Sequence, residues 1–313
     1  MKSFRTPRRG LCLAAVIVPV CVVALAAPIG ITAIIEPLCA AAASCAAAIL
    51  ADVCAAAVFL FARRGEGYAV VGFSGEAVEA AIPAVHNGLP VTAVGYRAFA
   101  DVGLTEVAIP EGVACIGSWA FADNMLASVA MPPRARSPRA QAVPPAPGPD
   151  AQSVAPEGGA SIGEGAFAFN RLESVSIPAG VASIGEAAFA GNLLGHASIP
   201  SDVARIGPWA FADNLLASVV ISEGVFYIGE GAFAFNRLSS VSLPEGLGQV
   251  GEAAFWSNPV VSITMPGGIA LPAAGNPAMG DHGDSFRAFY EASGRLAGRF
   301  KFAGGAWTGP FAP

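Results

Sequence analysis

The sequence is poor in the residues from which most catalytic and metal sites are built. Only 13% of its 313 residues are charged, and histidine occurs three times, at His86, His196 and His282. The three histidines lie far apart along the chain, so no Ser/His/Asp or Cys/His set can be assembled around them. Asp281 and Asp284 flank His282, but this spacing is more typical of a solvated turn than of metal ligands. We therefore expect no enzymatic activity, no cofactor and no metal site.

Cysteine and basic residues are also too few, or too clustered, for their usual roles. Five of the six cysteines lie in the first 54 residues and Cys115 stands alone, with no CxxC spacing. This arrangement indicates neither a disulfide framework nor a zinc site. From Gly65 onward the chain carries 11 basic and 21 acidic residues, a net charge of −10 against −6 for the whole chain. A domain with this balance repels phosphate backbones, so nucleic acid is not an expected partner.

What the sequence has in abundance is self-similarity. An Ala-Phe pair recurs seven times, and successive phenylalanines are 22 residues apart except for one interval of 46. A fixed period of 20–50 residues predicts a solenoid, propeller or array. A single unit buries too little apolar surface to offset the entropy of ordering its backbone, so neighbouring units must stack. The recurring phenylalanines are Phe99, Phe121, Phe167, Phe189, Phe211, Phe233 and Phe255.

Each repeat places the same residue types in the same registers. Counted from its Phe, Ile or Val stands five residues before and Gly four before; Asn stands three after in six copies, and Leu or Val five after. The Gly-x-x-Ala-Phe-Ala run predicts one helical or 3₁₀ turn, begun by a glycine where a side chain would obstruct the backbone. Alternation at the end of Leu172–Ile177 predicts a short half-buried strand that Pro178 terminates. We expect the Asn to bond the backbone of the neighbouring unit, forming a buried ladder.

The pattern Ile-Gly-x-x-Ala-Phe-x-x-Asn-x-Leu-x-x-Val-x-Ile-Pro resembles the BspA-type (treponemal-type) leucine-rich repeat of bacterial surface proteins. The resemblance runs from about Tyr68 to Ile269 and is carried by all seven copies. It implies an α/β solenoid of leucine-rich repeats, each about 22 residues long, right-handed and with a parallel sheet on one face. It also implies surface attachment and adhesion, and no catalytic residues.

The first 64 residues are typical of a membrane or signal segment. A basic start at residues 2–9 precedes Leu11–Ile35, a run of 25 residues without a charge. As a helix this run would extend about 37 Å, enough to cross a hydrocarbon core of about 30 Å. Together with the small residues at 24–26, it is also typical of a cleaved secretory signal. A second apolar run, Leu38–Ala62, contains Asp52 and is only marginal as a membrane span.

The sequence leaves the membrane topology open. If both apolar runs span, the basic flanks, with Arg63 and Arg64 at the second end, favour a hairpin with the repeats facing the cytoplasm. If only one run spans, or the first is a cleaved signal, the outcome depends on the second run. Ala43-Ser44-Cys45 is a weak lipoprotein signal. We expect membrane attachment through residues 11–62, with the repeats at the cell surface or in the periplasm rather than facing the cytoplasm.

Caps are expected at both ends of the repeats. At the N-terminal end, Tyr68–Phe73 predicts a strand and Asn87–Pro90 a turn. At the C-terminal end, Ser285–Ala292 predicts a short amphipathic helix, and Arg299–Trp307 predicts a hairpin that would cover the last repeat. The expected domains are 1–64 for the membrane or signal segment, 65–93 for the N-terminal cap, 94–270 for the solenoid and 271–313 for the C-terminal cap.

One insertion interrupts the solenoid. Pro132–Ala155 contains 24 residues, among them seven prolines and three arginines. Removing it would join Met131 to Pro156 and restore the 22-residue register. With almost no large apolar side chains, the insertion is expected to form an exposed loop outside the core. We favour a neutral insertion over a basic, proline-rich arm that binds a partner.

The outward strand positions are mostly small and lack the Trp, Tyr or Arg anchors of tight interfaces. Either a protein ligand is held weakly over many repeats, or small residues simply permit regular stacking. We expect a membrane-tethered or surface-exposed leucine-rich repeat binding module, for adhesion or protein–protein interaction with an unidentified protein ligand. The alternative is a cytoplasm-facing, membrane-anchored scaffold. The outward positions are Thr105, Glu106, Ala108, Ala127, Ser128, Ala130, Glu173, Ser174, Ser176, Gly195, His196, Ser198, Ala217, Ser218, Val220, Ser239, Ser240, Ser242, Val261, Ser262 and Thr264.

Overall fold

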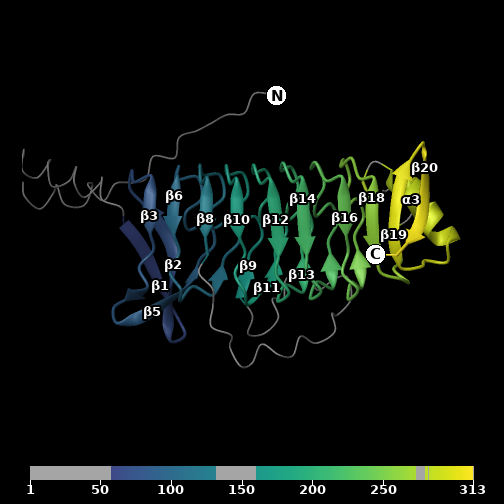
Figure 1. Ribbon diagram of the computed structural model, residues 1–313. Coiled ribbons are helices and arrows are strands. Elements are labelled where there is room, and N and C mark those ends of the chain that lie inside the picture. Colours follow the sequence, from purple (N-terminus) through teal and green to yellow (C-terminus); the bar gives the residue numbers. More distant parts are fainter. Residues whose placement is uncertain (1–57, 132–159, 273–278, 281, 313) are drawn as a thin grey trace, which may run out of the picture. The chain divides into compact units, whose positions relative to one another are not determined.

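The computed structural model describes the repeats and both of their ends (Figure 1). The described residues are 58–131, 160–272, 279–280 and 282–312. Contacts divide the chain into two compact units, and one of them, Phe59–Ser74 with Val78–Pro313, contains all seven repeats. The other unit, Met1–Val58 with Gly75–Ala77, is described only at Val58 and Gly75–Ala77. The first apolar run and the insertion at 132–155 therefore lie outside the described residues.

The seven repeats are stacked coils, which we number 1 to 7 by their phenylalanines, from Phe99 in coil 1 to Phe255 in coil 7. Each coil contributes a strand of two to six residues on each of two faces. The strands run parallel to their counterparts in the next coil, with a step of 22 residues at most pairs, as in Ile184 with Ile206. The coils are therefore in strict register along the stack.

One face of the stack is a continuous ten-stranded sheet, called here the long sheet. Its order is β1-β2-β5-β7-β9-β11-β13-β15-β17, with β4 paired to β5. Its strands are β1 (Val58–Arg64), β2 (Gly67–Ser74), β4 (Val85–His86), β5 (Leu89–Val94), β7 (Cys115–Ile116), β9 (Ala160–Ile162), β11 (Val181–Ile184), β13 (Arg205–Ile206), β15 (Tyr227–Ile228) and β17 (Gln249–Val250).

The other strands form three shorter sheets in series, called here the second row (Figure 1). Their strands lie where the alternating pattern predicts them, so this prediction is confirmed. The prediction of a sheet on one face was incomplete, because the residues before each Ile-Gly pair also bond from coil to coil and build the long sheet. The second row comprises β3 (Glu79–Ala81), β6 (Glu106–Ala108), β8 (Ser128–Ala130), β10 (Ser174–Ser176), β12 (His196–Ile199), β14 (Ser218–Ile221), β16 (Ser240–Ser242) and β18 (Ser262–Met265).

The core contains one column of aromatic rings. The seven phenylalanines are each 0% exposed. Neighbouring rings lie between 4.9 and 5.5 Å apart, centroid to centroid, and are nearly parallel. Because each ring contacts the rings of the coils before and after it, burial of the column requires the stack and cannot be achieved by one coil.

The predicted asparagine ladder is confirmed. In coil 5, the Oδ1 atom of Asn214 accepts a hydrogen bond from the backbone N–H of Leu194 in coil 4, at 3.1 Å. Its Nδ2 atom donates to the carbonyl of Phe189 at 2.9 Å, and to the carbonyls of Phe211 and Ala212 in its own coil at 3.2 and 3.1 Å. The same pattern recurs at Asn124, Asn170, Asn192, Asn236 and Asn258. Each buried amide thus joins two coils.

The run around each phenylalanine is a turn, and the expected helical or 3₁₀ turn is wrong. The residues two before and two after each Phe have positive φ, as at Trp209 (55°) and Asp213 (54°) in coil 5. A left-handed residue on either side of the Phe prevents a right-handed helical turn. The glycine that begins the run has another function. A Cβ on Gly207 would lie 2.6 Å from the backbone of Gly185, so the coils approach too closely there for any side chain.

The coil register continues across the insertion. In the long sheet Ile116 of coil 2 pairs with Ile162 of coil 3, and in the second row Ser128 pairs with Ser174. Both pairs are 46 residues apart in sequence, yet they are bonded as directly as pairs that are 22 apart. The chain leaves the solenoid at Met131, after a strand of the second row, and returns at Ala160, where a strand of the long sheet begins. The 24 additional residues therefore do not separate coils 2 and 3.

The N-terminal end begins earlier than the sequence predicts. Strand β1 occupies Val58–Arg64 and adds to the long sheet beside β2, so the last residues of the second apolar run form a strand and not a helix. The strand expected at Tyr68–Phe73 is confirmed as β2. The turn at Asn87-Gly88 is confirmed, and it joins the antiparallel strands β4 and β5. In the described part of the chain, no helix has the length and hydropathy of a membrane span.

The C-terminal end has the predicted helix and hairpin. Helix α3 spans Gly283–Ala292, and strands β19 (Gly298–Ala303) and β20 (Ala306–Phe311) form an antiparallel hairpin. Strand β19 pairs antiparallel with β18, the last strand of the second row, and so closes that edge. The apolar side chains that cover coil 7 are buried: Met279, Phe286, Tyr290, Phe300 and Trp307.

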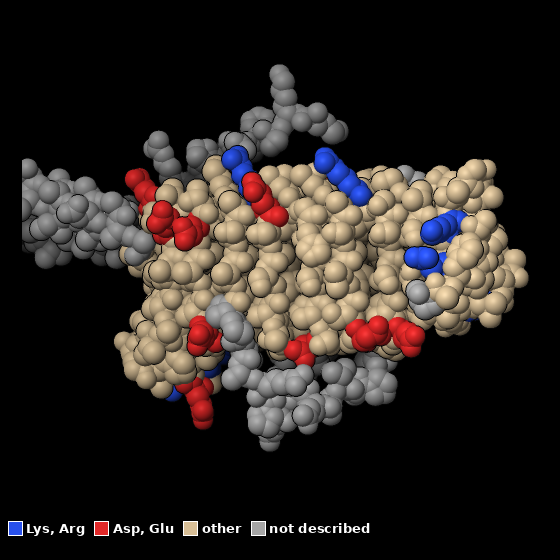
Figure 2. All heavy atoms as spheres, viewed as in Figure 1, with Lys and Arg blue, Asp and Glu red and all other residues tan. Residues whose placement is uncertain are grey.

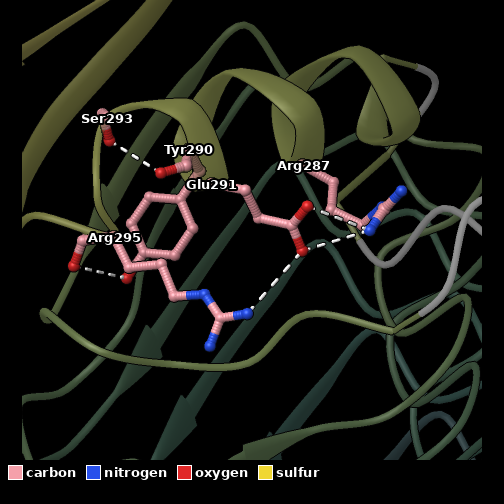
Figure 3. A network of polar contacts seen from close by, with 5 residues as sticks. All are labelled: Arg287, Tyr290, Glu291, Ser293 and Arg295. Carbon is pink, nitrogen blue, oxygen red and sulfur yellow. Dashed lines mark hydrogen bonds and ion pairs between the residues drawn. The ribbon is translucent and has the colours of Figure 1, made fainter.

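Polar contacts join the side chains of helix α3 to one another and to the residues that follow it (Figure 3). The hydroxyl of Tyr290 donates to the carbonyl of Pro266 at 2.9 Å and lies 3.3 Å from the carbonyl of Arg295. Glu291 accepts two hydrogen bonds from Arg287, at 3.1 and 3.2 Å, and forms an ion pair with Arg295. Burial raises the pKa of the Tyr290 phenol above its ordinary value of 10.0. These residues fix the end of the solenoid and do not form an open site.

Candidate binding surfaces

The structure keeps the three histidines apart. His86 stacks on Phe61 at the N-terminal end and His282 stacks on Phe302 at the C-terminal end, each with ring centroids 3.9 Å apart. His196, on β12, makes a hydrogen bond of 2.8 Å with the Ser218 hydroxyl. Within the described residues no group of three His, Cys, Asp or Glu side chains is arranged to hold a metal ion, and Asp281 lies outside them.

The outward positions of the second row form a polar face with little charge, called here the serine face. Most of them are serine or alanine, and from β8 to β18 none of the outward strand residues is charged. Figure 2 shows the same feature, because Lys, Arg, Asp and Glu lie near the edges and ends of the visible face and leave its middle uncharged. The large apolar exceptions are Val220, which is 52% exposed, and Val261, which is 42% exposed. The predicted absence of Trp, Tyr and Arg holds for this face.

The anchors that the serine face lacks lie on the long sheet. Arg205 and Tyr227 are paired neighbours on β13 and β15, and the guanidinium carbon of Arg205 lies 4.6 Å from the centroid of the Tyr227 ring. A cation over an aromatic face at this distance is a stabilising contact. Phe226, next to Tyr227, is 49% exposed. Sequence reasoning missed these residues because it considered outward positions of one sheet only.

A second set of anchors lies on the edge where the chain turns from the long sheet to the second row. We call this surface the turn edge and define it as the positions two and four residues after each Phe. The Asn between them points into the core, so its two neighbours point outward. The turn edge comprises Asp101, Gly103, Asp123, Met125, Phe169, Arg171, Gly191, Leu193, Asp213, Leu215, Phe235, Arg237, Ser257 and Pro259.

The turn edge has interface chemistry along most of its length. Phe169 is 54% exposed, Met125 48%, Leu193 44%, Phe235 43% and Leu215 36%. Trp256, one residue after the Phe of coil 7, is 42% exposed and meets Phe235 edge to face. Aromatic residues, Met and Arg are enriched at protein interfaces. The sequence contained a signal for this surface, because both Asn170 and Asn236 are preceded by Phe and followed by Arg.

Backbone hydrogen bonds make the turn edge continuous. From coil 2 to coil 6 the N–H of each of its residues donates to a carbonyl of a neighbouring coil, as from Leu193 to Leu172 and from Leu215 to Leu194 at 3.0 and 3.1 Å. Coils bonded in this way lie about 4.8 Å apart, so the seven coils extend over about 29 Å. The exposed side chains therefore form an ordered row and not scattered surface residues.

Comparisons with known proteins agree with this architecture. A model of the BspA type Leucine rich repeat region matches the chain in six copies, at residues 84–142 and 160–271. Among solved structures, a leucine rich cell surface protein from Faecalibacterium prausnitzii A2-165 is 22% identical with a TM-score of 0.52, and the alignment covers 70% of this chain and 58% of that protein. The chain thus spans little more than half of that relative.

Two further solved structures match the chain at lower overall similarity. The leucine-rich repeat protein of T. pallidum is 22% identical with a TM-score of 0.37, covering 56% of this chain and 74% of that one. The pneumococcal vaccine antigen PcpA is 14% identical with a TM-score of 0.40, covering 74% and 51%. No curated protein matches the sequence significantly.

Proposed function

Because the chain belongs to the BspA-type leucine-rich repeat family, we propose that it is a surface-exposed binding module that engages a protein ligand, with a role in adhesion or protein–protein interaction. The observation that carries the proposal is the continuous row of exposed apolar and arginine side chains on the turn edge. The similar structure from Faecalibacterium prausnitzii is that of a cell surface protein, which supports the same location for this chain.

The proposal includes attachment to the membrane through the part of residues 11–62 that precedes β1. Its support is the uncharged run Leu11–Ile35 and the basic residues before it. In the same proposal the leader predicted at 1–64 ends before β1, and the N-terminal cap predicted at 65–93 begins with that strand. The solenoid at 94–270 and the C-terminal cap at 271–313 keep their predicted bounds. The side of the membrane on which the solenoid lies separates a surface module from the alternative, a cytoplasm-facing scaffold.

Protease accessibility of a tag placed after Pro313 tests the location. Digestion of the tag in intact cells is the result expected for a surface module. Protection until an outer envelope is opened would place the solenoid in the periplasm. Protection until the inner membrane is breached would contradict the surface role and support the scaffold.

Removal of a whole coil tests the binding role. Deletion of Gly207–Ile228 removes 22 residues and joins Ile206 to Gly229, so the Ile-Gly register of the stack is retained. If the ligand is held over many coils, adhesion of cells to a protein-coated surface should fall in part. Deletion of residues 94–270 should abolish it. Equal adhesion by cells carrying the full chain and cells lacking residues 94–270 would contradict a binding function.

A further inference from the structure

The charges of the turn edge follow a pattern that the fold does not require. Its two arginines are Arg171 in coil 3 and Arg237 in coil 6, and its three aspartates lie in coils 1, 2 and 5. Within the described part of the chain, Arg171, Arg237, Asp123 and Asp213 form no ion pair, although all four are exposed. Their charges are therefore available to a partner.

The order of positive and negative charges along the turn edge is complementary to the same order read in the opposite direction. If two copies meet edge to edge with their axes antiparallel, and coil 4 lies opposite coil 4, then coil 3 lies opposite coil 5 and coil 2 opposite coil 6. Arg171 then meets the coil that carries Asp213, and Arg237 meets the coil that carries Asp123. In such a two-fold arrangement each contact occurs twice, because residue i meets j and j meets i.

The apolar side chains of the turn edge agree with the same arrangement. Leu193 lies at the centre, opposite its own counterpart in the second copy. Phe169 faces the coil of Leu215, and Met125 faces the coil of Phe235. The five apolar residues would thus be covered together, and two pairs of opposite charges would lie among them on each side of the centre.

Other arrangements of two copies bring like charges together. A parallel pairing places each coil opposite itself, so Arg171 meets Arg171. An antiparallel pairing shifted by one coil in one direction places coil 3 opposite coil 6, so Arg171 meets Arg237. A shift in the other direction places coil 2 opposite coil 5, so Asp123 meets Asp213. Like charges that meet directly are destabilising.

We propose that the turn edge is a self-association surface on which two copies of this chain pair antiparallel about Leu193. This goes beyond the proposed function, since it concerns copies of the same chain and does not depend on an adhesion ligand. A row about 29 Å long and about 10 Å wide covers less than the ~800 Å² per partner of a standard interface. The pairing is therefore weak in solution, with dissociation constants in the micromolar to millimolar range, and is favoured where copies are concentrated.

Charge reversal in two variants tests the pairing. The full chain in mild detergent is examined by sedimentation over about 10–1,000 μM, the concentration range appropriate to a weak interface. Arg171→Asp and Asp213→Arg should each weaken self-association at least tenfold, because each places two like pairs across the interface. An equimolar mixture of the two variants should associate again, since a mixed pair has one native and one reversed ion pair. Arg299→Asp, an exposed change on the terminal hairpin, is the matched control and should have no effect.

Two results would overturn the proposal. One is no concentration-dependent association of the unaltered chain over this range. The other is self-association that the single variants leave unchanged, or self-association that the variants weaken and their mixture does not restore. The leader or another face would then be responsible for the association. A photo-crosslinking residue at position 193 should give dimers joined at the turn edge, whereas one at position 220 on the serine face should not. Neither result depends on cell location or adhesion, so failure here is distinguishable from failure of the proposed function.

Discussion

The indole ring of Trp209 lies against Gly231 of the next coil, where a side chain would otherwise project. A Cβ built on Gly231 would lie 2.5 Å from Cε3 and Cζ3 of the indole. Both residues are left-handed, with φ of 55° and 57°. Trp119 and Gly165 repeat this relationship in coils 2 and 3. Trp and Gly therefore occupy the same position of two consecutive coils, because the indole ring of one coil fills the space that a side chain of the next coil would occupy.

Gly231→Ala should destabilise the protein by about 2–4 kcal/mol, the sum of overpacking against the indole and the strain of a left-handed alanine. Chemical denaturation measures the loss. Gly103→Ala is the matched control, because Gly103 also has positive φ but has no atom near a built Cβ. It should lose only about 1–2 kcal/mol. In a Trp209→Ala background the cost of Gly231→Ala should fall to the control value; an undiminished cost would show that the indole is not the obstacle.

Phe211→Ala should cost about 3–5 kcal/mol, because it removes one ring from the middle of the buried column and leaves a cavity. The ring is 0% exposed and contacts the rings of Phe189 and Phe233. The midpoint of thermal or denaturant unfolding measures the effect. Phe226→Ala, at a position 49% exposed, is the control and should cost much less. Equal losses at the two positions would contradict the assignment of the core.

Asn214→Leu should cost about 1–3 kcal/mol, because it leaves the N–H of Leu194 without its buried acceptor. The carbonyls of Phe189, Phe211 and Ala212 each lose one donor but keep another, from Asn192, Asn236 and Gly191. Asn214→Asp tests the donor role of the amide separately from its acceptor role. It keeps an acceptor for Leu194 but presents a carboxylate to the three carbonyls. Its cost should therefore decrease as the pH is lowered and the carboxylate becomes protonated. A pH-independent loss would contradict the donor role assigned to Nδ2.

Stability should decline in alkaline solution through Tyr290. Its folded pKa is raised because burial disfavours the phenolate. The folded state therefore keeps its proton when the unfolded chain loses it, so stability is full below the ordinary pKa of 10.0 and falls as the pH rises above it. Unfolding measured between about pH 9 and 11, on both sides of that ordinary value, detects the decline. Tyr290→Phe should be less stable at pH 8, because it loses the bond to Pro266, but should show a smaller decline.

The sequence predicted those parts of the fold in which one side chain has a single strong requirement, such as burial or a hydrogen-bond partner. A buried Phe at every twenty-second position, and a buried Asn three residues later, leave little choice but a stacked column and a ladder. The helix before Gly294 and the hairpin around Gly304 were also predicted, because their turn residues and alternation are local signals. The end caps follow from the need to close an open stack.

The long sheet and the left-handed turns were missed for a physical reason. Strands such as β13 and β15 contain only two residues. A strand of that length has no alternation to detect, and it exists because the next coil supplies its partner. The left-handed residues belong to Trp, Phe, Asp, Ala and Arg as well as Gly, so composition does not mark them. They are held by tertiary hydrogen bonds that a single repeat does not contain.

The candidate surfaces were missed for a related reason. The sequence interpretation examined the outward positions of the predicted strands and found them small, and on the serine face this is confirmed. The exposed anchors lie outside those strands, on the turn edge and the long sheet. Recognising them requires knowing that the Asn side chain points inward, because that fixes the outward direction of its neighbours such as Phe169 and Arg171. The ladder thus defines the surface as well as the core.

The stacking of coils one upon the next determines how the molecule responds to mechanical load. In a solenoid each coil is held by the coils before and after it, so the terminal coil is the weakest point once its cover is removed. A pull on the C-terminal end first detaches the hairpin of β19 and β20 and then unwinds coil 7, followed by coil 6. Each coil releases 22 residues. This corresponds to about 75 Å of extended chain. A chain held at one end and pulled at the other therefore lengthens in steps while its inner coils stay folded.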